Sequence, residues 1–130
     1  WYVLDVVRDQ WSSDDVETQL ISTARSDGAH VLIHIPQDPG QAGKKQAISL
    51  VRMLAGYGVK IEPASGSKET RAFAFSAQVN VGNVKLVKGA WNKAFTEELR
   101  QFPRGKYKDQ VDSASDAFNE LALSVEWKTA

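Results

Sequence analysis

The stretch that decides the fold is HVLIHIPQDPGQAGKKQAISLVRMLAGYGVKIEP, residues 30–63. It begins with an apolar run, 30–35, that is typical of a buried strand and that the following proline is expected to end. Residues 37–43 predict a Pro/Gly loop, 44–58 a helix closed by glycine, and 59–63 a second strand. The inward residues of this helix are expected to be Ala47, Ile48, Val51 and Leu54. A strand, a helix and a strand in this order indicate two parallel strands joined by a helical crossover.

Upstream of this stretch the chain repeats the same alternation of strand and helix. Residues 1–7 (WYVLDVV) are mostly apolar and β-branched, and they predict a strand. Residues 12–28 predict a helix, because serine can cap its start, acidic residues fill its first turn and glycine follows it. Its expected apolar stripe is Val16, Leu20, Ile21 and Ala24. The resulting βαβαβ order predicts an α/β fold, with a largely parallel sheet covered by helices and right-handed crossovers.

Downstream, three more helices and one short strand are expected. The helices span residues 65–82, 91–103 and about 109–125, and the strand spans 83–87. The expected core residues of these helices are Ala72, Phe75, Val79, Trp91, Phe95, Leu99, Val111, Ala114, Phe118, Leu121 and Val125. No repeat or linker interrupts the chain, so we expect one domain over residues 1–130.

The composition excludes several classes of protein. Apolar residues make up 42% of the 130 residues, which is enough for a core. There is no apolar run of about 18 residues and no signal-peptide pattern, so we expect neither a membrane span nor secretion. The absence of cysteine excludes disulfides and thiolate metal sites, and it agrees with a cytoplasmic location.

The net charge is zero, but the charges are distributed unevenly along the chain. Residues 44–108 carry thirteen basic and four acidic residues, a net charge of +9, and the two flanking segments together carry −9. A basic block beside acidic segments is expected of a protein that contacts phosphate near acidic sites, although chance surface composition gives the same pattern.

Three aspartates lie on one face of the last expected helix. Asp109, Asp112 and Asp116 are spaced i, i+3, i+7 and lie nearly opposite its apolar stripe. That spacing alone favours a solvated acidic face. The alternative is a cation site, because carboxylates one turn apart repel unless a proton or cation lies between them, and hard divalent cations prefer oxygen ligands.

Other polar residues also allow two interpretations. Asp38 follows the strand 30–35, where parallel sheets form sites, but the residues alone favour an ordinary Asp-Pro-Gly turn. The adjacent GQAGKK lacks the spacing of a phosphate-binding loop. His30 and His34 share one face of the expected strand, where packing is favoured over zinc because further ligands are missing. Lys68 and Arg71 lie one turn apart at a helix start, and either hold phosphate or form a solvated face.

Three segments together resemble one known family. They are DPGQAGK (38–44), LAGYGVKIEPASGSKETRAFAFSAQVNVGNVKLVKGAW (54–91) and EELRQFPRGKYKDQVDSASDAFNEL (97–121). They are similar to the C-terminal nuclease domain of tailed-phage terminase large subunits, whose most specific motif is FPxGxHDDQVDA. The similarity covers essentially the whole chain. It implies a ribonuclease H-like, three-layer fold with a mostly parallel sheet flanked by helices, related to RuvC-type resolvases.

The resemblance also implies roles for individual residues. Asp109 matches the second of the family's paired aspartates, and Asp112 matches the later aspartate before the small residue. Asp38 is the acid nearest the family's strand-end carboxylate. These three are the implied catalytic and metal-binding residues, and Asp116 is placed outside the site, either behind the ligands or in solvent.

The sequence departs from the family pattern in several places. Lys108 stands where the family often has the first aspartate of the pair, Tyr107 replaces the usual histidine, and Pro36 stands where relatives can carry glutamate. The resemblance further implies that the first strands, with an essential aspartate, and the ATPase domain are missing, so that the domain is N-terminally truncated. We therefore expect the isolated chain to cleave DNA weakly or not at all.

The activity that the resemblance implies is metal-dependent endonuclease cleavage of concatemeric DNA during packaging of a phage genome. The carboxylates would hold two Mg²⁺ or Mn²⁺ ions about 3.5–4 Å apart, one activating water and one stabilising the leaving 3′ oxygen. Double-stranded DNA would be bound in a salt-dependent way. The expected DNA-binding residues are Lys44, Lys68, Arg71, Arg104, Lys106 and Lys108.

The implied partners are the terminase small subunit and the portal protein, in the cytoplasm of a bacterial host of the phage or prophage. An exposed sheet edge would in addition invite pairing with a second copy of the chain. Three alternatives stay open: a catalytically dead, prophage-derived DNA-binding module, a RuvC-like resolvase, and an α/β scaffold without affinity for metal or DNA.

Overall fold

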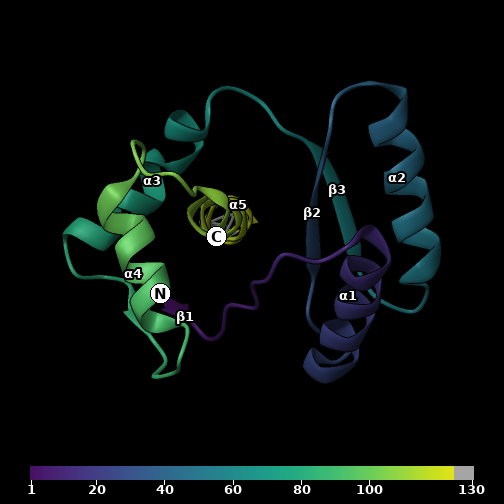
Figure 1. The fold of residues 1–130 in the computed structure, drawn as a ribbon, viewed down its shortest axis with the longest axis horizontal. Coiled ribbons are helices and arrows are strands. Elements are labelled where there is room, and N and C mark those ends of the chain that lie inside the picture. The colour runs from purple at the N-terminus through teal and green to yellow at the C-terminus, as the bar shows by residue number, and fades with distance from the viewer. Residues whose placement is uncertain (125–130) are drawn as a thin grey trace, which may run out of the picture. The chain divides into compact units, whose positions relative to one another are not determined.

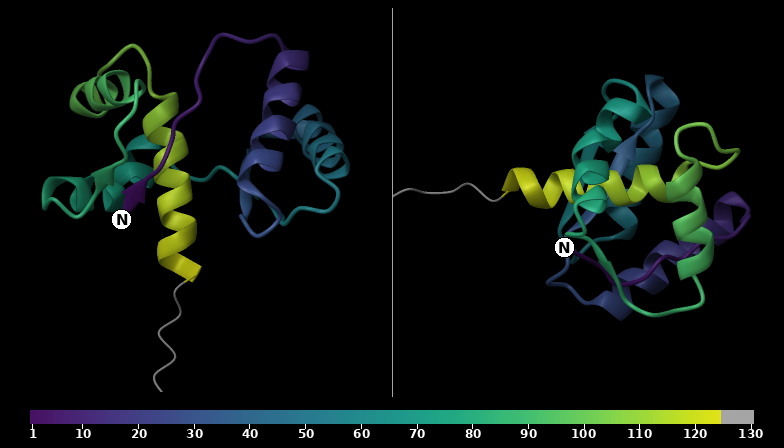
Figure 2. Two further views of the ribbon diagram at one scale, coloured as in Figure 1. Left: turned by 90° about the horizontal axis from the view of Figure 1, so that it is seen from below. Right: turned by 90° about the vertical axis from the view of Figure 1, so that its left-hand side faces the viewer.

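The computed structural model describes residues 1–124 and divides the chain into two compact units. Unit 1 consists of Trp1–Arg8 together with the chain from Ser65 onward, and unit 2 consists of Asp9–Ala64. Figures 1 and 2 show the helices and strands of each unit. In the described part of the chain, no helix combines the length and the apolar character that crossing a membrane requires.

Unit 2 contains the strand–helix–strand motif that the opening stretch predicts. Strands β2 (Ile33–Gln37) and β3 (Val59–Pro63) pair in parallel, with Ile35 opposite Ile61. Helix α2 (Gly40–Met53) connects them and lies alongside the strand pair (Figure 1). Helix α1 (Ser13–Asp27) precedes them; the Ser12 hydroxyl accepts the Asp15 N–H, and Gly28, at a φ of 91°, follows its end. The parallel pair and the predicted cap are therefore confirmed.

The boundaries around α2 differ from the predicted ones. Strand β2 starts three residues later than expected and continues through Pro36, which a strand with a free edge tolerates. The expected loop 37–43 is shorter, because α2 already begins at Gly40. Gly43 is buried in its first turns, where the backbone carbonyl of Asp38 occupies the space that a Cβ atom would need. A side chain at position 43 would clash with this carbonyl, so glycine at this position is compatible with a helix that starts so soon after the strand.

The core of unit 2 is small and aliphatic. Its buried apolar residues are Ala24, Ala47, Leu50 and Leu54. Val16, Ile48 and Val51 were expected to face inward, but all three are exposed. Ile48 and Val51 instead line an open, mostly apolar groove along α2 and β3. Periodicity therefore identified the apolar side of α2, but the described part of the chain covers only half of it.

Unit 1 contains its own short parallel pair and three helices. Strand β1 (Tyr2–Val3) pairs with β4 (Lys85–Leu86), and helices α3 (Lys68–Asn80), α4 (Asn92–Gln101) and α5 (Asp109–Ser124) follow the predicted order. The expectation that the first strand joins the sheet of unit 2 is wrong. The apolar character of residues 1–7 predicts a strand but does not specify its partner, and only two of those residues pair.

An aromatic core holds unit 1 together. Phe75, Phe95 and Phe118 come from α3, α4 and α5, respectively, and are buried, with the rings of Phe75 and Phe118 5.7 Å apart. Trp91 packs edge-on against Phe95, at 5.7 Å between ring centroids. Leu121, also expected in this core, is exposed. Val125 lies outside the described residues. Three predicted helices therefore converge on one cluster, which fixes α3 and α5 relative to each other.

Candidate carboxylate site

A buried carboxylate fixes the first turn of α5. Glu98, on α4, accepts the backbone N–H of Val111 at 2.6 Å and the side-chain amide of Gln110 at 3.2 Å. It thereby satisfies one of the N–H groups that a helix start leaves without a partner, and its charge suits the positive end of the helix dipole. The carbonyl of Lys108 accepts the Asp112 N–H at 2.9 Å. The turn that carries Asp109 and Asp112 is therefore anchored to α4 by Glu98.

Helix α3 brings two cations to this turn. The Ser67 hydroxyl accepts the Thr70 N–H at 3.1 Å and caps the helix, so Lys68 and Arg71 lie in its first turn. Helices α3 and α5 pack against each other, and the Asn119 side-chain amide donates to the backbone carbonyl of Arg71 at 2.9 Å. The two residues that we expected to contact phosphate therefore face the aspartates of α5.

Arg71 forms the most connected contact of the site. Its Nη2 lies 2.9 Å from Asp112 Oδ1, and its Nη1 donates to the carbonyl of Gly66 at 2.9 Å and to that of Ser65 at 3.4 Å. Its Nε is buried, has no hydrogen-bond partner among residues 1–124, and lies 3.8 Å from Asp116 Oδ1. One guanidinium therefore connects α5 to the loop that precedes α3.

Lys68 lies between the first two aspartates. Its Nζ is 3.6 Å from Asp109 Oδ1 and 3.6 Å from Asp112 Oδ2. One ammonium is thus the common ion-pair partner of both carboxylates. Carboxylate oxygens are also the ligands that Mg²⁺ and Mn²⁺ prefer. Asp109 and Asp112 therefore offer the ligand type that such an ion takes, and their role as metal ligands stays a prediction.

The three aspartates differ sharply in exposure. The side chain of Asp109 is 92% exposed, whereas those of Asp112 and Asp116 are 19% and 15% exposed. The interpretation as a solvated face is therefore wrong for Asp112 and Asp116. A helical wheel places them opposite the apolar stripe, but that second face is covered by α3 and its arginine. Asp116 lies behind Asp112, next to the same guanidinium.

Asp38 belongs to unit 2 and is described separately from this cluster. As predicted, Asp38 follows β2 directly, and it is exposed in the short connection to α2. Its position at the end of a parallel strand is the one where such sheets form sites. Its role as a third ligand stays a prediction.

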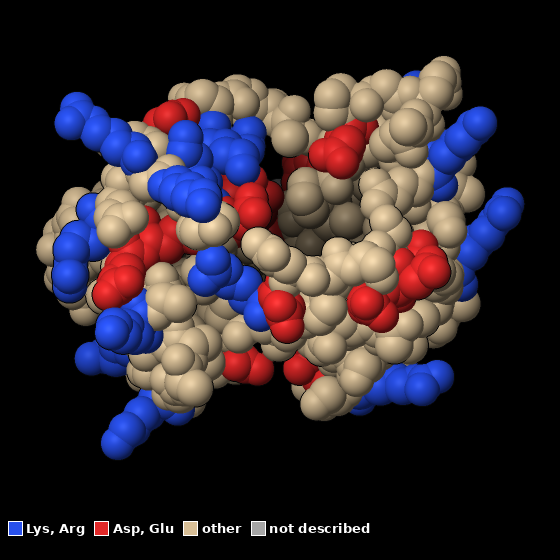
Figure 3. Space-filling view, viewed as in Figure 1, with Lys and Arg blue, Asp and Glu red and all other residues tan. Residues whose placement is uncertain are grey.

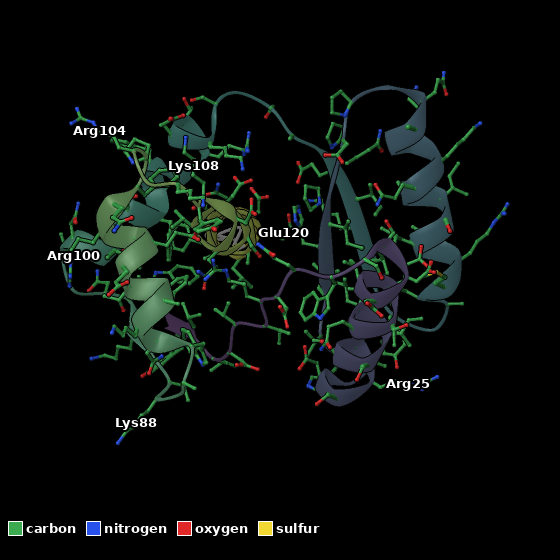
Figure 4. All side chains as sticks on the ribbon, in the orientation of Figure 1. Arg25, Lys88, Arg100, Arg104, Lys108 and Glu120 are labelled. Carbon is green, nitrogen blue, oxygen red and sulfur yellow. The ribbon has the colours of Figure 1, made fainter. Side chains whose placement is uncertain are left out.

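The remaining basic candidates lie on exposed turns and helices. Lys44 is exposed on α2 in unit 2, and Arg104, Lys106 and Lys108 lie between α4 and α5 in unit 1. The Lys106 ammonium lies 5.2 Å from the centre of the Tyr107 ring, and the Arg8 guanidinium lies 5.0 Å from it. Figure 3 shows Lys and Arg side chains around acidic ones on unit 1, and Figure 4 shows Arg104 pointing outward. These side chains remain predicted DNA contacts.

Sequence reasoning missed two polar features. Glu98 lies three residues after Phe95, on the apolar side of α4, and an acid at a core position was the available signal. His34 contacts Glu62 across β2 and β3 at 3.1 Å between Nε2 and Oε2. This hydrogen bond, helped by the charge of Lys60, lowers the pKa of Glu62 below its ordinary value. His30 precedes β2, so the two histidines do not share a strand.

Comparison with known proteins identifies the family of the chain. The terminase RNase H-like domain family matches residues 1–123, a range that includes both units and every candidate carboxylate. No curated protein and no solved structure gives a significant match to the chain. The family match confirms the resemblance to a terminase nuclease domain and the RNase H-like α/β fold class, which here is built from two short parallel strand pairs and helices. The chain therefore belongs to the terminase RNase H-like domain family.

Proposed function

We propose that this chain is the metal-dependent DNA endonuclease domain of a phage terminase large subunit, which cuts concatemeric DNA during genome packaging. Family membership supports a nuclease role in packaging. The observation that carries the metal-dependent part is the position of Lys68 Nζ, 3.6 Å from an oxygen of each of Asp109 and Asp112. Mg²⁺ is usually bound through one or two carboxylates together with waters and phosphate oxygens, and this pair of carboxylates suits that pattern.

In this proposal Asp109 and Asp112 hold the metal, and Asp38 is the candidate for a third carboxylate. When bound, the metal supplies an activated water and neutralises charge that develops on the cleaved phosphodiester. The protein's own residues keep the carboxylates in place: Glu98 anchors the helix start, and the ion pairs of α3 hold Asp112. Double-stranded DNA would lie along Lys44, Arg104, Lys106 and Lys108, whose contacts to phosphate would weaken as salt rises.

A plasmid-nicking assay tests this proposal. We expect slow nicking in Mn²⁺, none in chelator, and loss of nicking in Asp112→Asn and in Asp38→Asn. Asp27→Asn is the matched control, because Asp27 is also an exposed aspartate of unit 2 and lies at the end of α1. Asp38→Asn should change the free energy of unfolding by no more than about 0.5 kcal/mol, since the side chain is at the surface. Nicking that persists in Asp112→Asn would overturn the assignment.

A second candidate is a DNA-binding module without nuclease activity. Two observations favour it: Lys68 and Arg71 already neutralise the acidic cluster, and Pro36 occupies the strand position where the family can carry glutamate. It predicts salt-dependent binding of duplex DNA with no nicking and no Mn²⁺ uptake in the same samples. Mn²⁺ uptake that requires Asp109 and Asp112 would exclude it in favour of the nuclease.

A further inference from the structure

We propose that Arg71 is a positioning residue that decides which oxygen of Asp112 is presented to a metal ion. This inference rests on the proposed nuclease function and deepens it. The sequence pattern favours no such role, since Arg71 is expected either to hold phosphate or to lie in solvent. Its side chain is only 17% exposed, and its contacts go to aspartates and backbone carbonyls within the described part of unit 1.

The two oxygens of Asp112 face different cations. Oδ1 is 2.9 Å from Arg71 Nη2, a charge-assisted hydrogen bond, whereas Oδ2 is 3.6 Å from Lys68 Nζ, at the position shared with Asp109. Rotation of the carboxylate would exchange these roles. Because the short bond to Arg71 holds Oδ1, Oδ2 remains directed at the shared position. The guanidinium thus fixes the orientation of the carboxylate without occupying the place where a metal would bind.

Arg71 can hold Asp112 only because Arg71 is itself held. Nη1 donates to the carbonyls of Gly66 and Ser65, and the backbone carbonyl of Arg71 accepts the Asn119 amide. The planar guanidinium can bind on several edges at once, which a lysine ammonium cannot reproduce in the same geometry. The Nε group is buried and forms no hydrogen bond with the described residues, but it lies 3.8 Å from Asp116 Oδ1, an ion pair that also orients the guanidinium. Partners behind a metal ligand commonly affect metal affinity through such orientation.

Lys68 contacts the same aspartates as a competitor of the metal, in contrast to Arg71. Its ammonium occupies the shared position itself, and its side chain is more exposed, at 39%. A divalent ion that binds Asp109 and Asp112 must therefore displace Lys68 but can leave Arg71 in place. Neutral replacements of the two cations should consequently change metal affinity in opposite directions: removal of Lys68 removes a competitor, whereas removal of Arg71 releases the ligand.

Calorimetric titration of Mn²⁺ into the folded chain tests this directly. Arg71→Gln should weaken Mn²⁺ binding about 10-fold to 100-fold, the range found for partners of metal ligands. Arg71→Lys should fall between wild type and Arg71→Gln. Lys68→Gln should bind Mn²⁺ more tightly than wild type. Arg100→Gln removes an exposed arginine of the same unit (Figure 4) and should leave the affinity unchanged. Circular dichroism would confirm that each variant is folded under the titration conditions.

A second measurement monitors the contact between Arg71 and Asp112 by NMR, and it requires neither a bound metal nor an activity assay. The Nε–H of Arg71 is buried, so its NMR signal should exchange slowly with solvent, and Asp112→Asn should shift it while leaving the Arg100 signal in place.

The outcomes separate this inference from the proposed function. If wild type binds Mn²⁺ and the folded Arg71→Gln variant binds it with the same affinity, the positioning role is overturned and the nuclease assignment stays intact. An Arg71 signal unaffected by Asp112→Asn would also overturn it. If wild type and Lys68→Gln both bind no Mn²⁺, the metal site of the proposed function fails, and the role of Arg71 toward a metal fails with it.

Discussion

Unit 1 and unit 2 each combine a parallel strand pair with helices, yet they hold their candidate carboxylates in opposite ways. In unit 1, Asp112 lies on a helix that is packed against an aromatic core, and its carboxylate is bound by a largely buried guanidinium. In unit 2, Asp38 lies in an exposed connection above a small aliphatic core. Both positions suit a metal ligand by sequence, but only the first is largely buried and bound by a cation within its own described unit. The comparison shows two ways of placing a carboxylate. Asp38 is placed by the end of a strand alone, whereas Asp112 is placed by packed helices and is also oriented by the largely buried Arg71.

The largest effect is expected from a change to the aromatic core. Phe95→Ala should lower the free energy of unfolding by about 3–5 kcal/mol, because Phe95 is fully buried between α3 and α5. Hydrogen exchange followed by peptide should then accelerate in α3 and α5 but not in α1 and α2. Leu54→Ala, in the core of unit 2, is the matched variant. It should lower the free energy of unfolding by about 2–5 kcal/mol, and hydrogen exchange should then accelerate in α1 and α2 but not in α3 and α5. Equal acceleration in both units in either variant would mean that they unfold together.

A smaller effect is expected at the start of α5. Glu98→Ala should cost about 1–3 kcal/mol, because it leaves the buried N–H of Val111 without a partner. Glu98→Gln should cost less, since an amide oxygen can still accept that hydrogen bond. Urea unfolding measures both, with Glu97→Gln as the exposed neighbouring control. A loss in Glu98→Ala no larger than in the control would show that the cap does not anchor the turn of Asp109 and Asp112.

The smallest effect is expected at the parallel strand pair of unit 2. The hydrogen bond from His34 lowers the pKa of Glu62 below its ordinary value of 4.5, so this pair favours the ionised carboxylate in the folded state. Its stabilising contribution is present above pH 4.5 and is lost as the pH falls through the lowered pKa. His34→Ala should raise the pKa of Glu62 toward 4.5, as measured by NMR of the carboxyl carbon. Lys60→Ala should raise it less, because the charge of Lys60 is the weaker cause. An unchanged pKa in His34→Ala would contradict the contact.

The sequence predicted those parts of the fold that depend on local signals. The serine cap of α1, the start of α5 at Asp109 and the strand 59–63 all follow from neighbouring residues, and the structure confirms them. Pairing depends on partners far along the chain, so the apolar run at residues 1–7 did not reveal that β1 joins β4. Nor did periodicity show that part of the apolar side of α2, at Ile48 and Val51, is left exposed.

The organisation of the candidate site could not be predicted from the sequence, and the roles of its residues stay a prediction. The resemblance pointed to Asp109 and Asp112, and in the structure an oxygen of each lies 3.6 Å from the Lys68 ammonium. Helical spacing could not show that α3 covers the same face, because the partner of Asp112 is Arg71, 41 residues earlier. The same two basic residues were therefore interpreted as phosphate contacts or solvated side chains, when their present partners are carboxylates.

The pairing of β1 with β4 has a consequence for synthesis of the protein. Val3 pairs with Leu86, so about 80 residues must leave the ribosome before β1 has a partner. At about 5–20 residues per second, this takes roughly 4–16 s. Every residue of unit 2 emerges within that interval, so unit 2 can fold while the first strand is still waiting. Because unit 2 is inserted between the two segments of unit 1, unit 2 can complete its fold on the ribosome before unit 1 does.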